Sequence, residues 1–237
     1  MGLAAWATTC ANSVLASLFE PPCAACRATL PRPLDGAVCE GCWSSVGNAA
    51  PIELRFEAAA AIGWAMAIDA YDGRMKDIIH ALKYDRRRTI SPRLGDLMRQ
   101  RGAALLREAD CVVPVPLHPR REYTRGFNQA HDLAIHLGLP VVMLLKRVIS
   151  TQSQIDLPRE ERHRNVRDAF AFQPACPERD RLGLTSRSSR RPPGVVVIVD
   201  DVATTGATLE SCAAVLKQSG VKEVRALTAA RVVSARR

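Results

Sequence analysis

The apolar run at 194–199, Gly-Val-Val-Val-Ile-Val, restricts the fold of this chain more than any other segment. Its β-branched residues predict a short buried strand, because such a run bounded by turn signals is typical of sheet cores. A helix is predicted next, over 207–219, with Gly220 suited to its C-terminal cap. A last strand is predicted within 221–233. Strand, helix and strand in succession imply right-handed crossovers, so the sequence predicts an α/β fold with a parallel sheet.

The turn after this strand has the composition of a phosphate site. Asp200 and Asp201 follow the strand directly, at the carboxyl edge where open α/β sheets bind ligands. A glycine in the turn allows close approach, and unpaired amides at the helix start favour a dianionic phosphate. The residues expected to hold it are Ala203, Thr204, Thr205, Gly206, Ala207 and Thr208. The carboxylates should then face ribose hydroxyls or a cation; the alternative is a turn that only caps a helix.

Other nucleotide motifs are missing, and the charge of the chain favours anionic partners. No Gly-x-x-x-x-Gly-Lys-Ser/Thr loop occurs and no Gly-x-Gly-x-x-Gly follows a strand, which disfavours an ATP motor and a dinucleotide site. Lysine and arginine outnumber aspartate and glutamate by 33 to 24, for a formal charge of +9. Such a chain attracts phosphates, nucleotides or nucleic acid. A surface that is simply rich in solvated arginine is the alternative.

Four of the eight cysteines form two Cys-x-x-Cys pairs separated by twelve residues. They are Cys23, Cys26, Cys39 and Cys42. Each pair turns two thiolates toward one point, and the intervening loop can bring the pairs together into a tetrahedral site. The segment is too small for a core of its own, so a bound metal would supply its folding energy. Zinc is predicted, with a redox or iron–sulfur role as the alternative.

The rest of the chain alternates between predicted strands and helices. A strand is predicted from the alternation within 58–71, and a helix follows at 74–83. The other predicted elements are a helix that follows Pro92 and reaches Leu105, strands at 111–116 and 141–145, and a helix at 128–137. The prolines within 111–116 indicate a bend or an edge strand. The cation-rich residues 117–126 are predicted to form a loop.

The predicted organisation is an amphipathic helix at 1–20, a four-cysteine module at 21–50 and an α/β domain at 58–237. Within that domain, 146–168 is polar and basic and 173–194 lacks periodicity, so both are expected to be flexible. The N-terminal helix is expected to pack on the body of the protein, with a partner surface as the alternative. No span of about 18 apolar residues and no signal peptide is recognised, so a cytoplasmic location is expected.

Residues 195–209 resemble the phosphoribosyl diphosphate motif of type I phosphoribosyltransferases. A larger part of the chain, most of 20–232, resembles the ComF family of competence-associated and GntX-like proteins. The segments that carry this resemblance are the paired cysteines within 23–42 and residues 71–75, 82–84, 113–118, 125–130, 154, 164–166 and 199–208. The resemblance implies a phosphoribosyltransferase-like domain that follows an N-terminal zinc ribbon. The insertion at 173–194 is longer than is usual in the family.

The resemblance also implies roles for the residues of the turn. Asp200 and Asp201 would be the catalytic pair and would hold the 2′- and 3′-hydroxyls of the ribose. Residues 203–208 would hold the 5′-phosphate. Mg2+ would bridge the diphosphate and ribose oxygens and neutralise charge on the leaving group.

Cationic segments outside the turn have implied roles as well. The loop at 117–126, with Arg121 and Arg125, would bind pyrophosphate. The basic segment 150–167 would close over the site as a hood. Lys83, at the end of a predicted helix, could reach a phosphate or serve as a plain C-terminal helix cation.

Three functions are compatible with these features. The first is a Mg2+-dependent phosphoribosyltransferase that acts on phosphoribosyl diphosphate or a related ribose 5-phosphate and an unknown acceptor. The second is a single-stranded DNA-binding factor in DNA uptake during competence, which the family resemblance implies and the positive charge supports. The third is a scaffold whose zinc module docks another competence or iron–sulfur protein.

Overall fold

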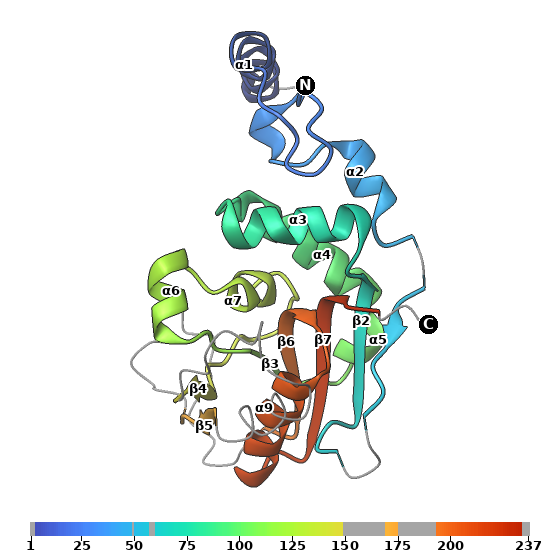
Figure 1. The fold of residues 1–237 in the computed structure, drawn as a ribbon, viewed down its shortest axis with the longest axis vertical. Helices are drawn as coiled ribbons and strands as arrows, with labels where there is room; N and C mark the ends of the chain where they lie inside the picture. The colour runs from blue at the N-terminus through green and yellow to red at the C-terminus, as the bar shows by residue number, and fades with distance from the viewer. Residues whose placement is uncertain (1–2, 49, 57–59, 149–168, 175–192, 234–237) are drawn as a thin grey trace.

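The computed structural model describes residues 3–48, 50–56, 60–148, 169–174 and 193–233 (Figure 1). A five-stranded sheet forms the centre of the fold, in the order β1-β2-β7-β6-β3. Its strands are β1 (Ile52–Glu53), β2 (Trp64–Ala70), β3 (Cys111–Pro114), β6 (Val195–Ala203) and β7 (Glu223–Arg231). All neighbouring strands are parallel except β1 and β2. The α/β class predicted from the sequence is confirmed, whereas the short antiparallel edge strand was not predicted.

Strand β6 is buried on both faces, which explains its apolar sequence. Its odd residues Val197 and Val199 pack against the helices of one face, and its even residues Val196 and Ile198 pack against the other. The first face carries α3 (Gly73–Tyr84), α4 (Ser91–Arg101) and α7 (Gln129–Ala134). The second carries α9 (Ala207–Gln218) and a small sheet of β4 (Leu145–Arg147) and β5 (Phe170–Phe172).

The helices predicted at 74–83 and 207–219 are confirmed as α3 and α9. The helix predicted beyond Pro92 is split in two, because α4 ends at Arg101 and α5 spans Ala103–Leu106. Gly102 lies between them, where an added Cβ atom would come within 2.7 Å of Leu227 on β7. A glycine is needed there because the backbone passes directly over the sheet.

The prediction of a loop at 117–126 is wrong, because residues Pro119–Arg125 form helix α6. The local signals for a helix are present. Pro119 occupies its first turn, the side chain of His118 accepts a hydrogen bond from the Arg120 amide, and Gly126 ends the helix with a φ of 79°. The high density of cations in this segment hid these signals.

The strand predicted at 141–145 is also wrong. Val141 forms only an isolated bridge to Val112, and β4 begins at Leu145 in a separate two-stranded sheet. The edge position predicted for residues 111–116 is confirmed, since β3 is the last strand of the main sheet. Pro114 and Pro116 lack the amide hydrogen that a further full strand would require.

The cysteine-rich segment shares a hydrophobic core with the α/β domain. It contains α2 (Glu40–Ser45) and the short helix η1 (Pro33–Asp35), and it lies against α3 at one end of the molecule (Figure 1). Buried residues of the segment, including Trp43, belong to the same cluster as Ile78 and Leu82 of α3. The segment is therefore packed onto the α/β domain and does not form a separate folding unit.

Helix α1 (Leu3–Phe19) lies beyond the cysteine-rich segment and contacts η1. Its buried Asn12 accepts a hydrogen bond from the Leu34 amide and donates one to Asp35. Two apolar residues of this helix, Val14 and Leu18, are 55% and 71% exposed.

The two segments predicted to be flexible lie mainly outside the described residues. These are the basic segment after Arg147, with its proposed hood at 150–167, and the insertion at 173–194, of which 175–192 is not described. Across the part of the chain that the structure describes, no helix combines the length and apolarity that crossing a bilayer requires.

Candidate ribose-phosphate site and cysteine cluster

The two carboxylates predicted from the sequence lie at the carboxyl end of β6, although the strand is longer than predicted. It continues to Ala203 because its pairing with β7 persists to that residue. Asp200 and Asp201 are therefore the sixth and seventh residues of a strand rather than part of a turn. Since successive strand residues point to opposite faces, the two side chains leave the sheet on different sides.

The turn into α9 contains a glycine and three threonines at or before the start of the helix. Gly206 precedes the helix with a φ of 84°, in the left-handed region that favours glycine. Thr204 and Thr205 are exposed, and Thr208 is half-buried in the first turn of the helix. A Cβ atom at Gly206 would come within 2.7 Å of the Phe56 ring, so an aromatic side chain covers one side of the turn.

Asp201 forms an ion pair with Lys83, which comes from the last turn of α3. The Lys83 ammonium lies 2.8 Å from Oδ1 of Asp201, and the two side chains are only 15% and 10% exposed. Burial by itself lowers the pKa of Lys83, but the negative charges of Asp201 and Asp200 outweigh this and raise it. Lys83 is thus a buried partner of Asp201, and its role is neither to cap α3 alone nor to offer a free, exposed charge to a ligand.

Asp200 has a different environment, on the α9 face of the sheet. Burial, followed by the charge of Asp201, raises the pKa of Asp200 to about 7, although the positive charges of Lys83 and Arg147 act in the opposite direction. Its carboxylate also accepts a hydrogen bond of 2.8 Å from the Asp201 amide. Asp200 therefore lacks the lysine partner within hydrogen-bonding distance that Asp201 has.

Arg147 and Cys212 are neighbours of Asp200 that the sequence did not single out. Arg147 lies on β4 with its guanidinium 5.3 Å from the centre of the Phe170 ring. Burial and then the charge of Arg121 lower the pKa of Arg147, while burial and then the charge of Asp200 raise that of Cys212. The small sheet thus brings a second cation to the end of β6, which no local pattern could have indicated.

The cations of α6 lie beside the segment that follows α3. Arg125 donates a hydrogen bond of 2.9 Å to Gln129, and its guanidinium lies 5.3 Å from the centre of the Tyr84 ring. Arg121 is exposed. Its backbone amide is bonded to the His118 carbonyl within the helix, so any contact of Arg121 with pyrophosphate has to come from its side chain.

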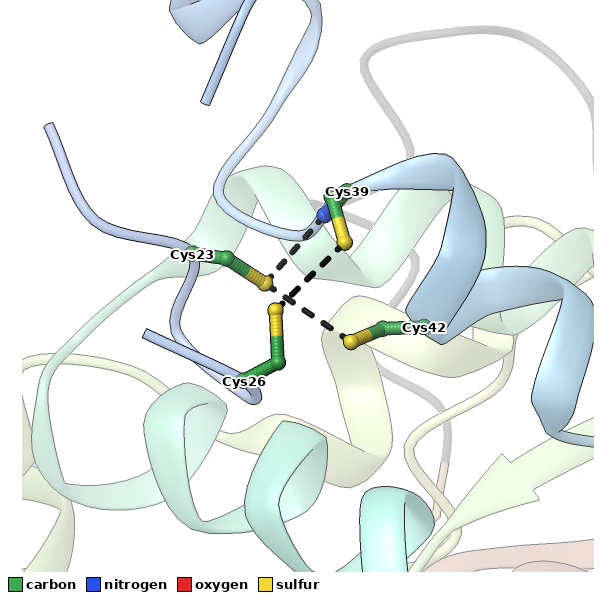
Figure 2. A group of neighbouring side chains, drawn as sticks. All are labelled: Cys23, Cys26, Cys39 and Cys42. Carbon is green, nitrogen blue, oxygen red and sulfur yellow. Dashed lines mark hydrogen bonds between the residues drawn. The ribbon is translucent and has the colours of Figure 1, made fainter. Parts of the chain in front are cut away.

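The four cysteines converge as predicted, and their ligand atoms all lie within 4.8 Å of one another (Figure 2). The sulfur atoms of Cys23 and Cys42 are 3.9 Å apart, and those of Cys26 and Cys39 are 3.7 Å apart. A tetrahedral zinc ion with bonds of about 2.3 Å separates its sulfur ligands by about 3.8 Å. All four cysteines are free rather than paired in disulfides, so they form a group that fits a metal ion.

The surroundings of the cluster shift the pKa values of two of its thiols in opposite directions, and they also join the cluster to the domain. Burial, followed by side-chain hydrogen bonds with Cys39, Cys26 and Cys23, raises the pKa of Cys42. Burial raises the pKa of Cys23, but hydrogen bonds from the amides of Cys26, Cys39 and Ala25 outweigh it and lower this pKa to about 6. The Ala25 carbonyl accepts a hydrogen bond of 3.0 Å from Arg74 of α3.

A second connection joins α2 to α4. Arg93 pairs with Glu40, and its guanidinium lies 5.1 Å from the Trp43 ring. Geometry at the cysteines is therefore coupled to both α3 and α4.

Comparison with known domains defines the class to which the α/β part belongs. A family model described as phosphoribosyl transferase domain matches residues 123–236. Similar solved structures include a purine phosphoribosyltransferase from Pyrococcus horikoshii, 17% identical, covering 59% of this chain and 81% of that one with a TM-score of 0.31. Another is a hypoxanthine phosphoribosyltransferase from Staphylococcus aureus, 14% identical, covering 60% and 68% with a TM-score of 0.30. The match to the family model identifies this part of the chain as a phosphoribosyltransferase-like α/β fold.

Relatives of known name share more of the chain. DNA utilization protein YhgH of Salmonella typhimurium is 32% identical over 170 residues, 68% of either chain. Competence protein F of Haemophilus influenzae is 32% identical over 125 residues, which are 51% of this chain and about half (49%) of that protein. Competence protein ComFC of Streptococcus pneumoniae is 29% identical over 177 residues, 70% and 67% of the two chains. The chain belongs to the ComF family of competence and DNA utilization proteins.

Proposed function

We propose that the chain binds phosphoribosyl diphosphate, or a ribose 5-phosphate group, with Mg2+ at the turn from β6 to α9. The observation that carries this proposal is the pair Asp200 and Asp201 at the carboxyl end of a parallel strand, followed by the glycine that starts α9. The amides and hydroxyls of 203–208 suit a phosphate, and the carboxylates suit ribose hydroxyls. One ligand with a phosphate and vicinal hydroxyls matches both halves of the site.

The proposed reaction is transfer of the phosphoribosyl group to a nucleophile. The nucleophile bonds to C1′ of the ribose as the bond from C1′ to the pyrophosphate oxygen breaks, and pyrophosphate leaves with the electron pair. Side chains of Arg121 and Arg125 would stabilise the charge on pyrophosphate as it departs. Mg2+, held by the oxygens of the ligand, would neutralise part of the same charge. The four cysteines would hold a structural zinc ion.

Phosphoribosyl diphosphate with Mg2+ is expected to bind saturably in isothermal titration calorimetry. The Asp200→Ala/Asp201→Ala variant should bind at least about 100-fold more weakly, because two charge-assisted hydrogen bonds contribute roughly 1.5 kcal/mol or more each. The matched control is Asp77→Ala/Asp96→Ala, which removes two exposed carboxylates from α3 and α4. Binding that is equal in all three proteins would place the ligand elsewhere, and no binding in any of them would exclude this ligand. Pyrophosphate release with candidate acceptors would then test turnover.

A second function is favoured by the surface around α6, defined here as Tyr84, Arg86, Arg120, Arg121, Tyr123 and Arg125. Tyr123 is 91% exposed, and Arg86 donates a hydrogen bond to the Thr124 carbonyl, which joins the two segments. Exposed aromatic rings among cations suit the stacked bases and phosphates of single-stranded nucleic acid. We propose this surface, the α6 surface, as a binding site for single-stranded DNA.

Single-stranded DNA is expected to bind the protein with an affinity that falls at least about tenfold between 50 and 200 mM salt. Tyr123→Ala should weaken binding by about 5-fold or more if a base stacks on this ring. Fluorescence anisotropy with a labelled oligonucleotide measures both effects, and Arg32→Ala, at an exposed arginine of the cysteine-rich segment, is the control. An affinity independent of salt, or an equal loss in the control, would exclude the α6 surface.

A further inference from the structure

The ion pair between Lys83 and Asp201 crosses from a covering helix to the central strand. Lys83 lies in the last turn of α3, and Asp201 lies near the end of β6 on the face that α3 covers. The atoms are 2.8 Å apart, and both side chains are largely buried. Solvent and salt screen such a pair weakly, so its charges are strongly coupled.

The ammonium of Lys83 is directed at Asp201, and its side chain is only 15% exposed. If the ammonium left Asp201 for a phosphate, that carboxylate would be buried without a partner. Exposed cations that could reach an anion at far smaller cost lie on α6, at Arg120 and Arg121. From its position on α3, Lys83 is better placed to interact with Asp201 than with the ligand.

A polyanionic ligand creates a need for such a cation. Two adjacent carboxylates at the mouth of a site repel phosphates, yet they are also the groups that accept hydrogen bonds from ribose hydroxyls. A lysine paired with Asp201 offsets one of these two negative charges. Lys83 meets this need, because it approaches from α3 and not from the turn.

The groups around the carboxyl pair agree with this division of charge. Lys83 of α3, Arg147 of β4 and Cys212 of α9 interact with the carboxyl pair, and Tyr71, which precedes α3, interacts with Lys83. Asp200 is raised in pKa by burial and by the charge of Asp201, and Lys83 is the first of the groups that lower it. The lysine therefore influences both carboxyl groups, one by contact and one through space.

We infer that Lys83 is a positioning residue that serves as the permanent counter-ion of Asp201, and thereby admits a polyanionic ribose phosphate to a site with two adjacent carboxylates. This inference rests on the proposed ribose-phosphate function for its ligand. The ion pair itself does not depend on that function, so it has a readout of its own in the free protein.

A double-mutant cycle with phosphoribosyl diphosphate and Mg2+ tests the ligand half of the inference. At pH 8, Lys83→Met is expected to weaken binding at least about tenfold, because the carboxylate of Asp201 then lacks its counter-ion. In the Asp201→Asn background, the same change should alter the affinity by less than about threefold. The loss in Lys83→Met should shrink at pH 6, below the pKa of about 7 at which Asp200 takes up a proton. Equal losses in both backgrounds would overturn the inference and make Lys83 a direct ligand contact.

A titration of the free protein tests the other half and separates its failure from that of the proposed function. Carboxyl 13C NMR should show one aspartate that titrates near neutral pH and disappears in Asp200→Asn. Its midpoint should move upward in Lys83→Met and return toward the original value in Lys83→Arg, which keeps the charge. If this midpoint does not move, Lys83 is not the counter-ion, whether or not the protein binds phosphoribosyl diphosphate. If Lys83→Met does not fold, Lys83→Met/Asp201→Asn should fold, because it removes both charges; failure of the double variant as well would overturn the counter-ion role.

Discussion

Replacing Cys23 and Cys26 by serine is expected to remove the bound metal and to lower the melting temperature of the whole chain by more than about 10 °C. Metal binding by four thiolates contributes on the order of 10 kcal/mol to folding in small modules. A loss of even a few kcal/mol lowers the melting temperature of a chain of this size by about 2–4 °C per kcal/mol. Metal analysis and scanning calorimetry of the two proteins measure the effects.

The shared core is the reason that the damage should reach the α/β domain. Cys23 and Cys42 are buried in the same cluster as Ile78 and Leu82 of α3. Opening the cysteine segment would therefore expose apolar surface of α3 to water. We expect one cooperative transition in the wild-type protein and not an early, separate melting of the N-terminal segment.

The control for this experiment is Cys10→Ser, since Cys10 is an exposed cysteine on α1 away from the cluster. It should keep the metal content and the melting temperature of the wild type. A double cysteine variant that loses its metal but melts like the wild type would contradict the shared core. A variant that keeps its metal would contradict the four-cysteine site.

Replacing Asp200 by asparagine is expected to stabilise the protein, and to do so only above acid pH. Burial raises the pKa of Asp200 from 3.8 to about 7, so keeping it charged in the folded protein costs free energy. At about 1.4 kcal/mol for each pKa unit, the free-energy cost of this charge has an upper bound of about 4 kcal/mol. Relaxation and partial exposure should reduce this to about 1–2 kcal/mol, or roughly 3–6 °C in melting temperature.

The sign follows from comparing the folded and unfolded chains. Well below pH 4, Asp200 is protonated in both states, and the asparagine gives no advantage. Between about pH 4 and pH 7 the unfolded chain has released this proton while the folded chain still holds it, so the wild type loses stability progressively until the folded chain releases it too. Melting curves of wild type and Asp200→Asn from pH 4 to pH 8 should therefore diverge progressively.

Asp96→Asn is the matched control, since Asp96 is an exposed carboxylate on α4 paired only with its helical neighbour Arg99. Its effect should be small at every pH. A stabilisation by Asp200→Asn that is the same at pH 4 and pH 8 would show that the buried charge is not the cause. A stabilised variant that binds phosphoribosyl diphosphate weakly would show that the site keeps this charge at the expense of stability.

Several features of this protein could be predicted from local sequence alone. The strand at 194–199 and the helix after it follow from a short apolar run, a turn and the glycine at 220, signals that neighbouring residues carry by themselves. The four cysteines converge because two short pairs on a reversing loop have few other ways to satisfy a metal. The order of carboxylates, threonines and glycine predicted the place of the candidate site, at the edge where parallel strands end.

Other features depend on contacts between residues that are far apart in the chain. The pairing of β6 with β7 extends the strand to Ala203 and so sends Asp200 and Asp201 to opposite faces. The packing of α3 brings Lys83 to Asp201 across a separation of 118 residues, and β4 brings Arg147 toward Asp200. Neither lysine nor arginine carries a local signal for its partner, because an ion pair depends on distance in space and on burial.

The same distinction applies to the cysteine-rich segment. Its composition predicts a metal site but not its attachment to the domain, because Trp43 and the apolar face of α3 are each compatible with many partners. Hydrophobic patterns state which residues are buried, and only the folded chain selects what they are buried against. In this protein a short stretch of sequence supplies the carboxylates, threonines and glycine of the candidate site. The cations that balance the carboxylates come from a helix and a strand that meet them only after folding.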